Sequence, residues 1–163
     1  MNAKRFNIRV YGLLFHEGCV LVSDELVAGE RITKFPGGGM VPGEGTLQCL
    51  KREVMEEMGL EARHLVHFYT TDFFQESAYR KADQVVSIYY TFTVDDPSSL
   101  KDGSPAAGKE ASAGQRFRWL SLAAAKETDV QLPIDRVVMR LILTAKENQL
   151  KGGSSAFHRE IDH

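Results

Sequence analysis

Apolar residues gather in short runs along much of the chain, and these runs have the composition of β-strands. They are rich in β-branched, aromatic and aliphatic residues and are bounded by turn-forming or charged residues. Six strands are expected, over residues 6–15, 19–23, 31–35, 65–74, 84–94 and 116–120. Only His16, Glu17 and Gly18 separate the first two, which predicts a hairpin. The fourth and fifth runs predict a long hairpin or two neighbouring strands.

Residues 46–58 have the spacing of an amphipathic helix. With successive residues placed 100° apart, four apolar positions fall within a stripe about 80° wide. These positions are Leu47, Leu50, Val54 and Met58. Thr46 is expected to cap the start of the helix, and Gly59 is expected to end it in the left-handed conformation.

A second helical pattern starts at Pro133 and runs towards Leu150, where Gly152 and Gly153 stop it. Its apolar positions are Ile134, Val137, Val138, Leu141 and Ile142. Because strands outnumber helices, we expect the α/β class, with helices packed on a mixed sheet.

Two stretches have no apolar period and predict loops. Residues 37–45 hold five of the 14 glycines, a density that disfavours the interior of a helix or strand. Residues 95–114 are rich in proline, glycine, serine, alanine and charge. We expect a mobile loop there rather than a domain linker, because too little sequence follows to build a second core.

The composition suits one globular domain. Of the 163 residues, 43% are hydrophobic and 26% are charged, which is enough for one core and excludes disordered, collagenous and coiled-coil chains. We expect a single domain over residues 1–153 and a flexible polar tail over residues 154–163. Cys19 and Cys49 lie in apolar segments, where free thiols are expected rather than a disulfide framework.

The charge of the chain narrows the partners. Its 20 Lys and Arg against 22 Asp and Glu give a formal net charge of −2, so no global basic field draws it to nucleic acid or to an anionic membrane. No run approaches the roughly 18 apolar residues that a membrane span requires, and the first residues do not resemble an export signal. We therefore expect a cytoplasmic protein without a membrane or nucleic-acid partner.

Three glutamates of the first predicted helix share a face apart from its apolar stripe. Residues three or four apart lie within about 60° or 40° of each other, which brings Glu53, Glu56 and Glu57 together. One interpretation is a solvated acidic face, partly offset by Lys51 and Arg52. The preceding glycines favour another, because they let phosphate oxygens approach the backbone, and carboxylates are the hard ligands that Mg²⁺ or Mn²⁺ prefers. Loop and helix together predict a metal-bridged phosphate site.

The same residues resemble the signature of the Nudix hydrolases. Gly38, five residues, Glu44, seven residues and then residues 52–60 match every fixed position of that signature. The flanks also fit, with a Phe-Pro-Gly-Gly turn that ends at Gly38 and a late strand at residues 118–120. The resemblance implies the Nudix fold, a mixed β-sheet sandwiched between α-helices, and metal-dependent hydrolysis of a pyrophosphate bond.

The resemblance also implies how a metal would be held. Glu53, Glu56 and Glu57 match the metal-binding glutamates of the family, with Mg²⁺ or Mn²⁺ as the cofactor. Glu53 and Glu57 are implied as direct ligands, and Glu56 as a ligand or as the group that activates water. Gly38 matches the glycine whose carbonyl joins the metal shell.

The supporting and proton-accepting groups are implied less directly. Arg52 and Glu44 match a pair that orients the loop and the helix. The base of the family often lies on a loop outside the signature, and the candidates are Glu76, Asp83 and Glu110. Exposed surface charge is the alternative interpretation for each of them. Glu110 is slightly favoured because it lies in the loop just before the strand that contains Trp119.

The substrate contacts are the least specified part of the resemblance. Aromatic faces stack on nucleobases and arginine binds phosphate in a fork, so the candidate contacts are Phe73, Phe74, Tyr79, Arg80 and Glu110. The alternative is that both phenylalanines are core strand residues. Where family pyrophosphatases often carry an acidic residue before the Arg-Trp pair, this chain has Gln115, Arg116 and Phe117. The substrate contacts of a particular subfamily therefore do not transfer.

The expected substrate is a small nucleoside diphosphate derivative, namely a nucleotide sugar, ADP-ribose, a dinucleoside polyphosphate or a nucleoside triphosphate. One alternative is a Nudix-like module that binds or regulates through a nucleotide without turnover, which the intact glutamates disfavour. Another is an isomerase of isoprenoid diphosphates on the same scaffold, but its additional cysteine and acidic pair are not evident. The loop over residues 95–114 could also reach a neighbouring copy, which would make a homodimer.

Overall fold

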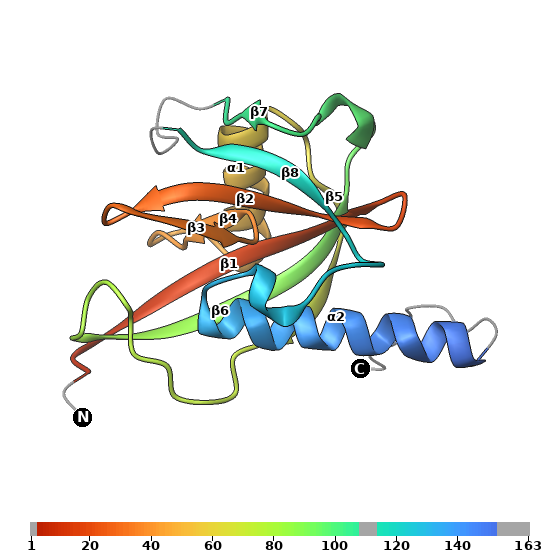
Figure 1. Cartoon of the computed structure of the whole chain (residues 1–163). Coiled ribbons are helices and arrows are strands. Elements are labelled where there is room, and N and C mark those ends of the chain that lie inside the picture. The colour runs from red at the N-terminus through yellow and green to blue at the C-terminus, as the bar shows by residue number, and fades with distance from the viewer. Residues whose placement is uncertain (1–2, 108–113, 153–163) are drawn as a thin grey trace, which may run out of the picture.

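The computed structural model describes residues 3–107 and 114–152 (Figure 1). Its strands are β1 (Arg5–His16), β2 (Cys19–Val27), β3 (Glu30–Lys34), β4 (Gly37–Gly39), β5 (Arg63–Thr70), β6 (Asp83–Thr93), β7 (Ser104–Pro105) and β8 (Arg116–Ser121). Its helices are α1 (Thr46–Met58), α2 (Pro133–Gly152) and two 3-10 turns, η1 (Pro97–Ser99) and η2 (Glu127–Asp129). Glu110 and the tail over residues 154–163 lie outside the described residues.

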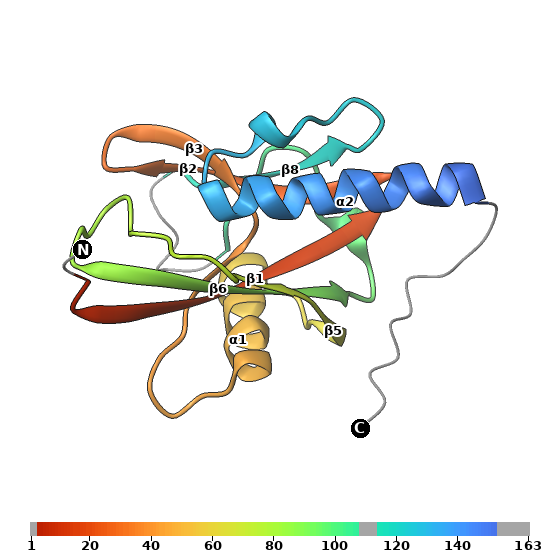
Figure 2. The same cartoon turned by 90° about the horizontal axis from the view of Figure 1, so that it is seen from below.

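The strands form one mixed sheet with the order β5-β6-β1-β2-β8-β7. In addition, β3 pairs with β2 and β4 pairs with β1. β1 and β6 run parallel, whereas β1 and β2 form the predicted antiparallel hairpin. Figure 2 shows α1 and α2 on opposite sides of β1 and β6. The structure confirms the α/β class and the sandwich of a mixed sheet between helices.

The central strand β1 contributes to the core on both sides of the sheet. Successive side chains of a strand point to opposite faces. Val10 and Leu14 accordingly pack in the apolar cluster that contains the buried residues of α1. Tyr11 and Leu13 pack in the cluster that contains the buried residues of α2. The alternation in one strand therefore places the two helices on opposite faces.

Gly12 of β1 has no room for a side chain. A Cβ atom there would lie 2.5 Å from Phe92 Cε1 and 3.0 Å from Leu50 Cδ1. We expect Gly12→Ala to lower the free energy of unfolding by about 1–3 kcal/mol through overpacking, measured by urea denaturation. The Phe92→Leu substitution should then lower the free energy of unfolding less in the Gly12→Ala protein than in the wild type. If the losses from the two substitutions simply add, the steric explanation is contradicted.

Helix α1 spans the predicted residues, but its N-cap differs from the prediction. Gly59 closes the helix at φ 67° and ψ 22°, as expected. The N-cap is Gly45, whose N–H donates to Gln48 Oε1 at 2.8 Å. The Thr46 hydroxyl instead contacts the Tyr90 hydroxyl at 2.7 Å, so it links α1 to β6.

Two apolar positions predicted for the core are at the surface. Leu47 is 46% exposed and Leu141 is 40% exposed, whereas Cys49 and Met139 are fully buried. Residues at the edge of an apolar stripe face the core or the solvent according to the rotation of the helix against the sheet. Cys49 and Cys19 are both free thiols, as predicted.

Asp135 anchors the first turn of α2 to the sheet. It is fully buried, and its carboxylate accepts hydrogen bonds from the Tyr89 hydroxyl at 2.5 Å and from the Phe35 N–H at 3.0 Å. Burial raises the pKa of Asp135 to about 6. Pro133 begins the helix, as predicted.

Three connecting segments differ from their predictions. Part of the predicted glycine loop forms the strand β4. This strand lies so close to β1 that a Cβ atom at Gly37 would be only 2.2 Å from the Val10 carbonyl oxygen. β5 ends before Phe73 and Phe74, which are 40% and 43% exposed, so the prediction of core strand residues is wrong for them. The predicted loop over residues 95–114 contains η1 and β7.

Candidate active site

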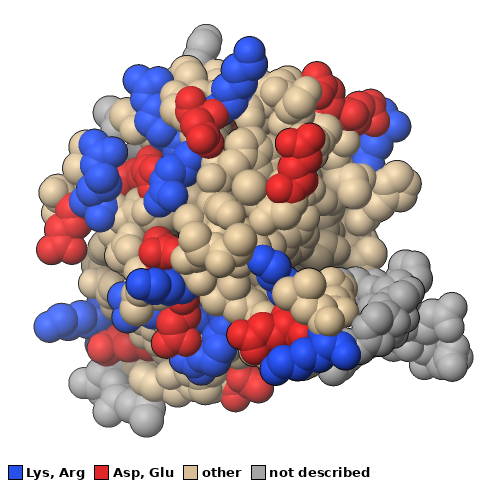
Figure 3. Space-filling model, turned by 45° about the vertical axis from the view of Figure 1, so that its right-hand side comes forward, with Lys and Arg blue, Asp and Glu red and all other residues tan. Residues whose placement is uncertain are grey.

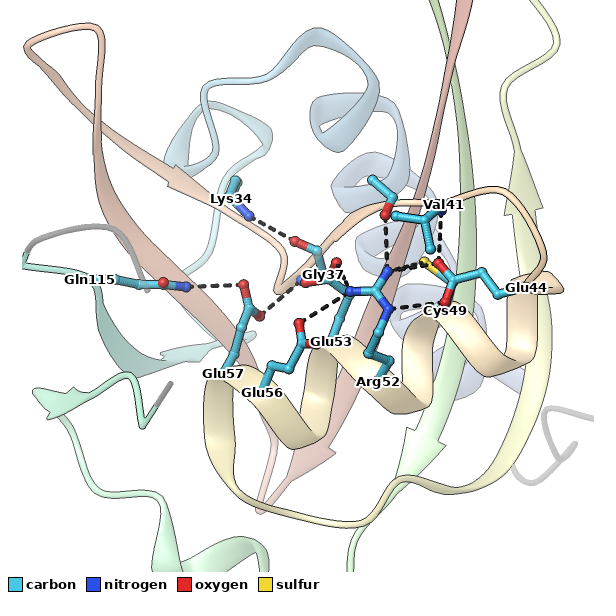
Figure 4. Close-up of polar contacts among 11 residues, drawn as sticks. Lys34, Gly37, Val41, Glu44, Cys49, Arg52, Glu53, Glu56, Glu57 and Gln115 are labelled. Carbon is cyan, nitrogen blue, oxygen red and sulfur yellow. Dashed lines mark hydrogen bonds and ion pairs between the residues drawn. The ribbon is translucent and has the colours of Figure 1, made fainter. Parts of the chain in front are cut away.

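Arg52 of α1 lies at the centre of the polar contacts in Figure 4. Its Nε and Nη2 donate to the two carboxylate oxygens of Glu44 at 3.0 and 2.7 Å. Nη2 also donates to the Gly39 carbonyl at 3.1 Å, and Nη1 donates to Glu53 at 2.8 Å and to Glu56 at 3.1 Å. Because a guanidinium presents several donors in a rigid fork, one side chain joins the helix to the glycine-rich loop and to β4.

Glu44 completes this contact from the loop before α1. Its Oε1 also accepts a hydrogen bond from the Val41 N–H at 2.9 Å. The hydrogen bonds from Arg52 lower the pKa of Glu44 to about 2. Cys49 lies next to this pair, and burial raises the pKa of its thiol to about 12, so the thiolate is scarce at neutral pH. These contacts support the expectation that Glu44 and Arg52 orient the loop and the helix.

Gly38 of β4 lies directly against the Glu53 carboxylate of α1. A Cβ atom at Gly38 would be 2.4 Å from Glu53 Oε1 and 2.6 Å from Glu53 Oε2. Any other residue would therefore displace the carboxylate or the strand. The absence of a side chain at Gly38 therefore lets the Glu53 carboxylate lie next to the backbone of β4.

Glu57 is held by donors other than Arg52. It accepts hydrogen bonds from the Gly37 N–H at 3.2 Å and from the Gln115 amide at 3.3 Å. Within residues 3–107 and 114–152, no three acidic, histidine or cysteine side chains are close enough to form a ready metal cluster. Glu53 and Glu56 share the Arg52 guanidinium, whereas Glu57 accepts from Gly37 and Gln115, so the three carboxylates are divided between two sets of hydrogen-bond donors.

A buried polar network behind Glu57 was not predicted. Gln115 donates to Ser23 Oγ at 3.0 Å and to Glu25 Oε1 at 2.9 Å, and Lys34 forms an ion pair with Glu25 at 3.1 Å. All four network residues are buried. The available signal was the amide at position 115, where the family pattern favours an acid. Since a buried ion pair requires well-placed partners, this network holds the amide that reaches Glu57.

Burial raises the pKa of Glu57 to about 7, against the opposing effects of Lys34 and Gln115. In metal-free protein, Glu57 therefore stays protonated in the folded state up to a pH of about 7, whereas in the unfolded state it loses its proton near its ordinary pKa of 4.5. The contribution of protonated Glu57 to the free energy of unfolding is complete below pH 4.5 and is lost as the pH rises through about 7.

Urea unfolding in EDTA at pH 5 and pH 8 should therefore show a smaller pH-dependent loss of stability in Glu57→Gln than in the wild type. Asp135 also has a raised pKa and contributes in both proteins, so the comparison isolates Glu57. Equal losses in the two proteins would contradict the raised pKa of Glu57.

A cavity of about 330 Å³ adjoins the buried network, because Glu25 and Lys34 line both. Its apolar and aromatic walls include Tyr11, Ile32, Tyr89 and Ile134. Tyr79 lines the cavity and is half-exposed. Phe73 and Phe74 are not among its lining residues. The structure thus brings one of the predicted aromatic substrate contacts to a cavity beside the site and leaves the two phenylalanines outside it.

The predicted base candidates lie in different places. Asp83 forms an ion pair with Arg5 at 3.0 Å. Arg5 lies five residues before Val10, which is the residue of β1 that pairs with Gly38. That separation is roughly 16 Å along a strand, which is too far for Asp83 to serve as a base near Gly38. Glu76 lines the cavity of about 330 Å³, and Glu110 lies outside the described residues.

The charged surface has no single sign on the face that Figure 3 shows, where acidic and basic side chains are interspersed. Among the described residues, neither helix is long and apolar enough to cross a membrane.

The possible metal ligands at the site are carboxylate oxygens and the backbone of β4, and this set suits a hard divalent cation. The residues present therefore fit the metal that the family resemblance implies.

Solved structures share this fold at low sequence identity. A NUDIX hydrolase from Nitrosomonas europaea has a TM-score of 0.63 and 21% identity, over 86% of this chain and 90% of that chain. A structure from a study of MutT from Aliivibrio salmonicida and Vibrio cholerae has a TM-score of 0.62 and 19% identity, over 86% and 98%. The solution structure of the E. coli ORF135 protein has a TM-score of 0.57 and 17% identity, over 95% and 99%.

The sequence was compared both with individual proteins and with models of whole families. No individual curated protein sequence matches the chain, but one family model does. The family model described as the NUDIX domain matches residues 5–141, which is most of the chain and includes the whole site on α1 and β4. The chain therefore belongs to the NUDIX family and is a pyrophosphohydrolase of the general Nudix type.

Proposed function

We propose that this chain is a Mg²⁺- or Mn²⁺-dependent hydrolase that cleaves a pyrophosphate bond in a nucleoside diphosphate linked to another moiety. The observation that carries the proposal is the contact between Gly38 and the Glu53 carboxylate. A solvated acidic face would need no such contact, whereas a site for a cation and phosphate needs hard oxygen ligands beside open backbone.

Glu53 and Glu57 are the proposed direct ligands of the cation, with the Gly38 carbonyl beside them. Glu56 is a further ligand or the group that takes a proton from the attacking water. Its side chain is 45% exposed, so it can exchange that proton with solvent. A divalent cation held by these groups would neutralise charge on the diphosphate and lower the pKa of a bound water.

The other residues of the site hold the carboxylates in position. Arg52 binds Glu53 and Glu56 while Glu44 binds Arg52 from the loop. Gln115 binds Glu57 from the opposite side. Phosphoryl transfer depends mainly on positioning and charge neutralisation, so fixed carboxylates are what this reaction requires from the protein.

The proposed substrates are nucleotide sugars, ADP-ribose, dinucleoside polyphosphates and nucleoside triphosphates. The cavity lined by Tyr79 and Tyr89 offers aromatic walls for the nucleoside part. We also propose that the protein is cytoplasmic, that residues 1–153 form one domain and that two copies form a homodimer. Size-exclusion chromatography with light scattering tests the dimer.

A panel of these substrates with Mg²⁺ or Mn²⁺ tests the function, with the products separated by chromatography. We expect release of a mononucleotide or phosphate product from at least one compound. Binding without any product would favour the non-catalytic module. Isomerisation of an isoprenoid diphosphate without hydrolysis of the panel would favour the isomerase.

A further inference from the structure

Two carboxylates from distant parts of the chain approach each other behind the candidate metal site. Glu25 of β2 and Glu57 of α1 each accept a hydrogen bond from the same atom, the side-chain nitrogen of Gln115, at 2.9 and 3.3 Å. The Ser23 hydroxyl oxygen lies 3.0 Å from that nitrogen. Three oxygen atoms, two of them from carboxylates, therefore surround one nitrogen atom, which we call the bridging nitrogen.

Lys34 supplies the positive charge next to the bridging nitrogen. Its ammonium forms an ion pair with Glu25 at 3.1 Å and donates to the Gly37 carbonyl at 3.4 Å. Lys34, Glu25 and Gln115 are all buried. Buried carboxylates at such short range require a cation or hydrogen-bond donors between them. Figure 4 shows Lys34 and Gln115 on the side of Glu57 that is away from Arg52, so the protein itself provides the donors on that side.

The charge that remains for a metal ion differs between the two sides of the site. Arg52 forms ion pairs with three carboxylates, those of Glu44, Glu53 and Glu56, which leaves an excess of two negative charges on its side. On the other side, Lys34 neutralises Glu25, and only the charge of Glu57 remains. Because a buried divalent ion requires several anionic ligands, the carboxylates suffice for an ion beside Arg52 but not for another beside Lys34.

We propose that the Gln115 amide and the Lys34 ammonium occupy the place of a second metal ion, so that the chain without substrate binds one divalent cation. Glu25 is then not a metal ligand, although it lies within reach of the nitrogen that contacts Glu57. This inference rests on the proposed function for the first ion. It makes Gln115 the residue that sets the number of ions, and ions that arrive with the substrate are additional.

Gln115→Glu should convert this place into a metal site. The substitution would put a third carboxylate where the bridging nitrogen lies, beside those of Glu25 and Glu57 and beside the Ser23 hydroxyl. Such a set of hard oxygen ligands suits Mn²⁺. Glu25 and Lys34 also line the cavity of about 330 Å³, which gives an ion a way in.

The number of Mn²⁺ ions bound without substrate tests the inference. The electron paramagnetic resonance signal of free Mn²⁺ is lost on binding, so a titration gives the number of ions per chain. We expect one ion for the wild type and two for Gln115→Glu. Gln149→Glu is the matched control, because it makes the same substitution at an exposed position of α2, and it should bind one ion.

A double variant separates the geometry of the second site from its charge. Glu25→Gln combined with Gln115→Glu exchanges the amide and the acid, so the network keeps its net charge and its number of carboxylates. Only two carboxylates, not three, then meet at the position of the bridging nitrogen. We expect this protein to bind one ion. Two ions in the double variant would contradict the role of Glu25 in the created site.

Urea unfolding provides a readout that does not depend on turnover. In EDTA, the Gln115→Glu protein should unfold at a lower urea concentration than the wild type, because three carboxylates repel one another at short range. Mn²⁺ should raise its midpoint more than it raises that of the wild type. If the variant is unfolded in EDTA, Mn²⁺ should refold it. If it does not fold even with Mn²⁺, the count for the wild type decides.

The outcomes distinguish this inference from the proposed function. Two ions per wild-type chain, or one ion in a folded Gln115→Glu protein, would overturn the inference alone if the wild type hydrolyses the substrate panel. One ion in a wild type that hydrolyses none of the panel would contradict the proposed function and leave the count intact. A wild type that binds no Mn²⁺ would contradict both.

Discussion

Glu57→Gln is expected to lower kcat/KM for pyrophosphate hydrolysis at least a hundredfold, which corresponds to a barrier higher by about 2.7 kcal/mol. The amide has nearly the same shape as the carboxylate, so the contacts with Gly37 and Gln115 can be rebuilt around it. What it lacks is the negative charge that a direct ligand of Mg²⁺ supplies. The Mg²⁺ concentration for half-maximal rate should therefore rise together with the loss of rate.

Glu147→Gln is the matched control for this variant. Glu147 is an exposed glutamate of α2, and its replacement removes the same charge away from the site. It should leave kcat/KM within twofold of the wild type. A Glu57→Gln protein that keeps its rate within about tenfold would show that Glu57 is not a metal ligand, because that change is only about 1.4 kcal/mol.

Gly38→Ala is expected to reduce kcat/KM at least tenfold while the fold stays intact. The new Cβ atom would meet the Glu53 carboxylate within 2.6 Å, and the end of that side chain can swing away. The relief of the clash therefore moves Glu53 rather than β4. The variant should lose activity with a change in unfolding free energy below about 1 kcal/mol, since the displaced group is not part of the apolar core.

The neighbouring glycine provides the control. A Cβ atom at Gly39 would approach only Arg9 Nη1, at 3.7 Å, which is an ordinary contact. Gly39→Ala should therefore keep most of the rate that Gly38→Ala loses. If both variants lose activity equally, the cause is the flexibility of the strand and not the position of Glu53. Urea unfolding of both proteins separates a loss of stability from a loss of the site.

Local chemistry was enough to predict most of the elements. α1 was predicted over its observed residues because the apolar spacing and Gly59 are properties of neighbouring positions along the chain. The hairpin of β1 and β2 depends equally on local turn residues. The candidate site on α1 was also proposed from sequence, since residues 38–60 place its glycine, its arginine and its glutamates within one continuous segment.

The errors occur where a residue's partner is distant in sequence. β4 was predicted as a loop because three glycines have no strand propensity, and pairing with β1 overrides that preference. Leu47 and Leu141 were predicted in the core because a helical stripe has no absolute rotation until the sheet is placed against it. Phe73 and Phe74 were placed in a strand that ends before them.

The sequence alone was sufficient for the α/β class and for the boundaries of α1, and it brought the proposed metal-binding glutamates into one helix, because these features depend on residues within a few turns of each other. Tertiary structure alone decided that Gln115 contacts Glu57, 58 residues away, and that Lys34 pairs with Glu25 behind it. It also decided that Tyr79 lines the cavity beside the site. Burial and hydrogen bonding select such long-range partners only when the chain has folded, and no local pattern encodes them.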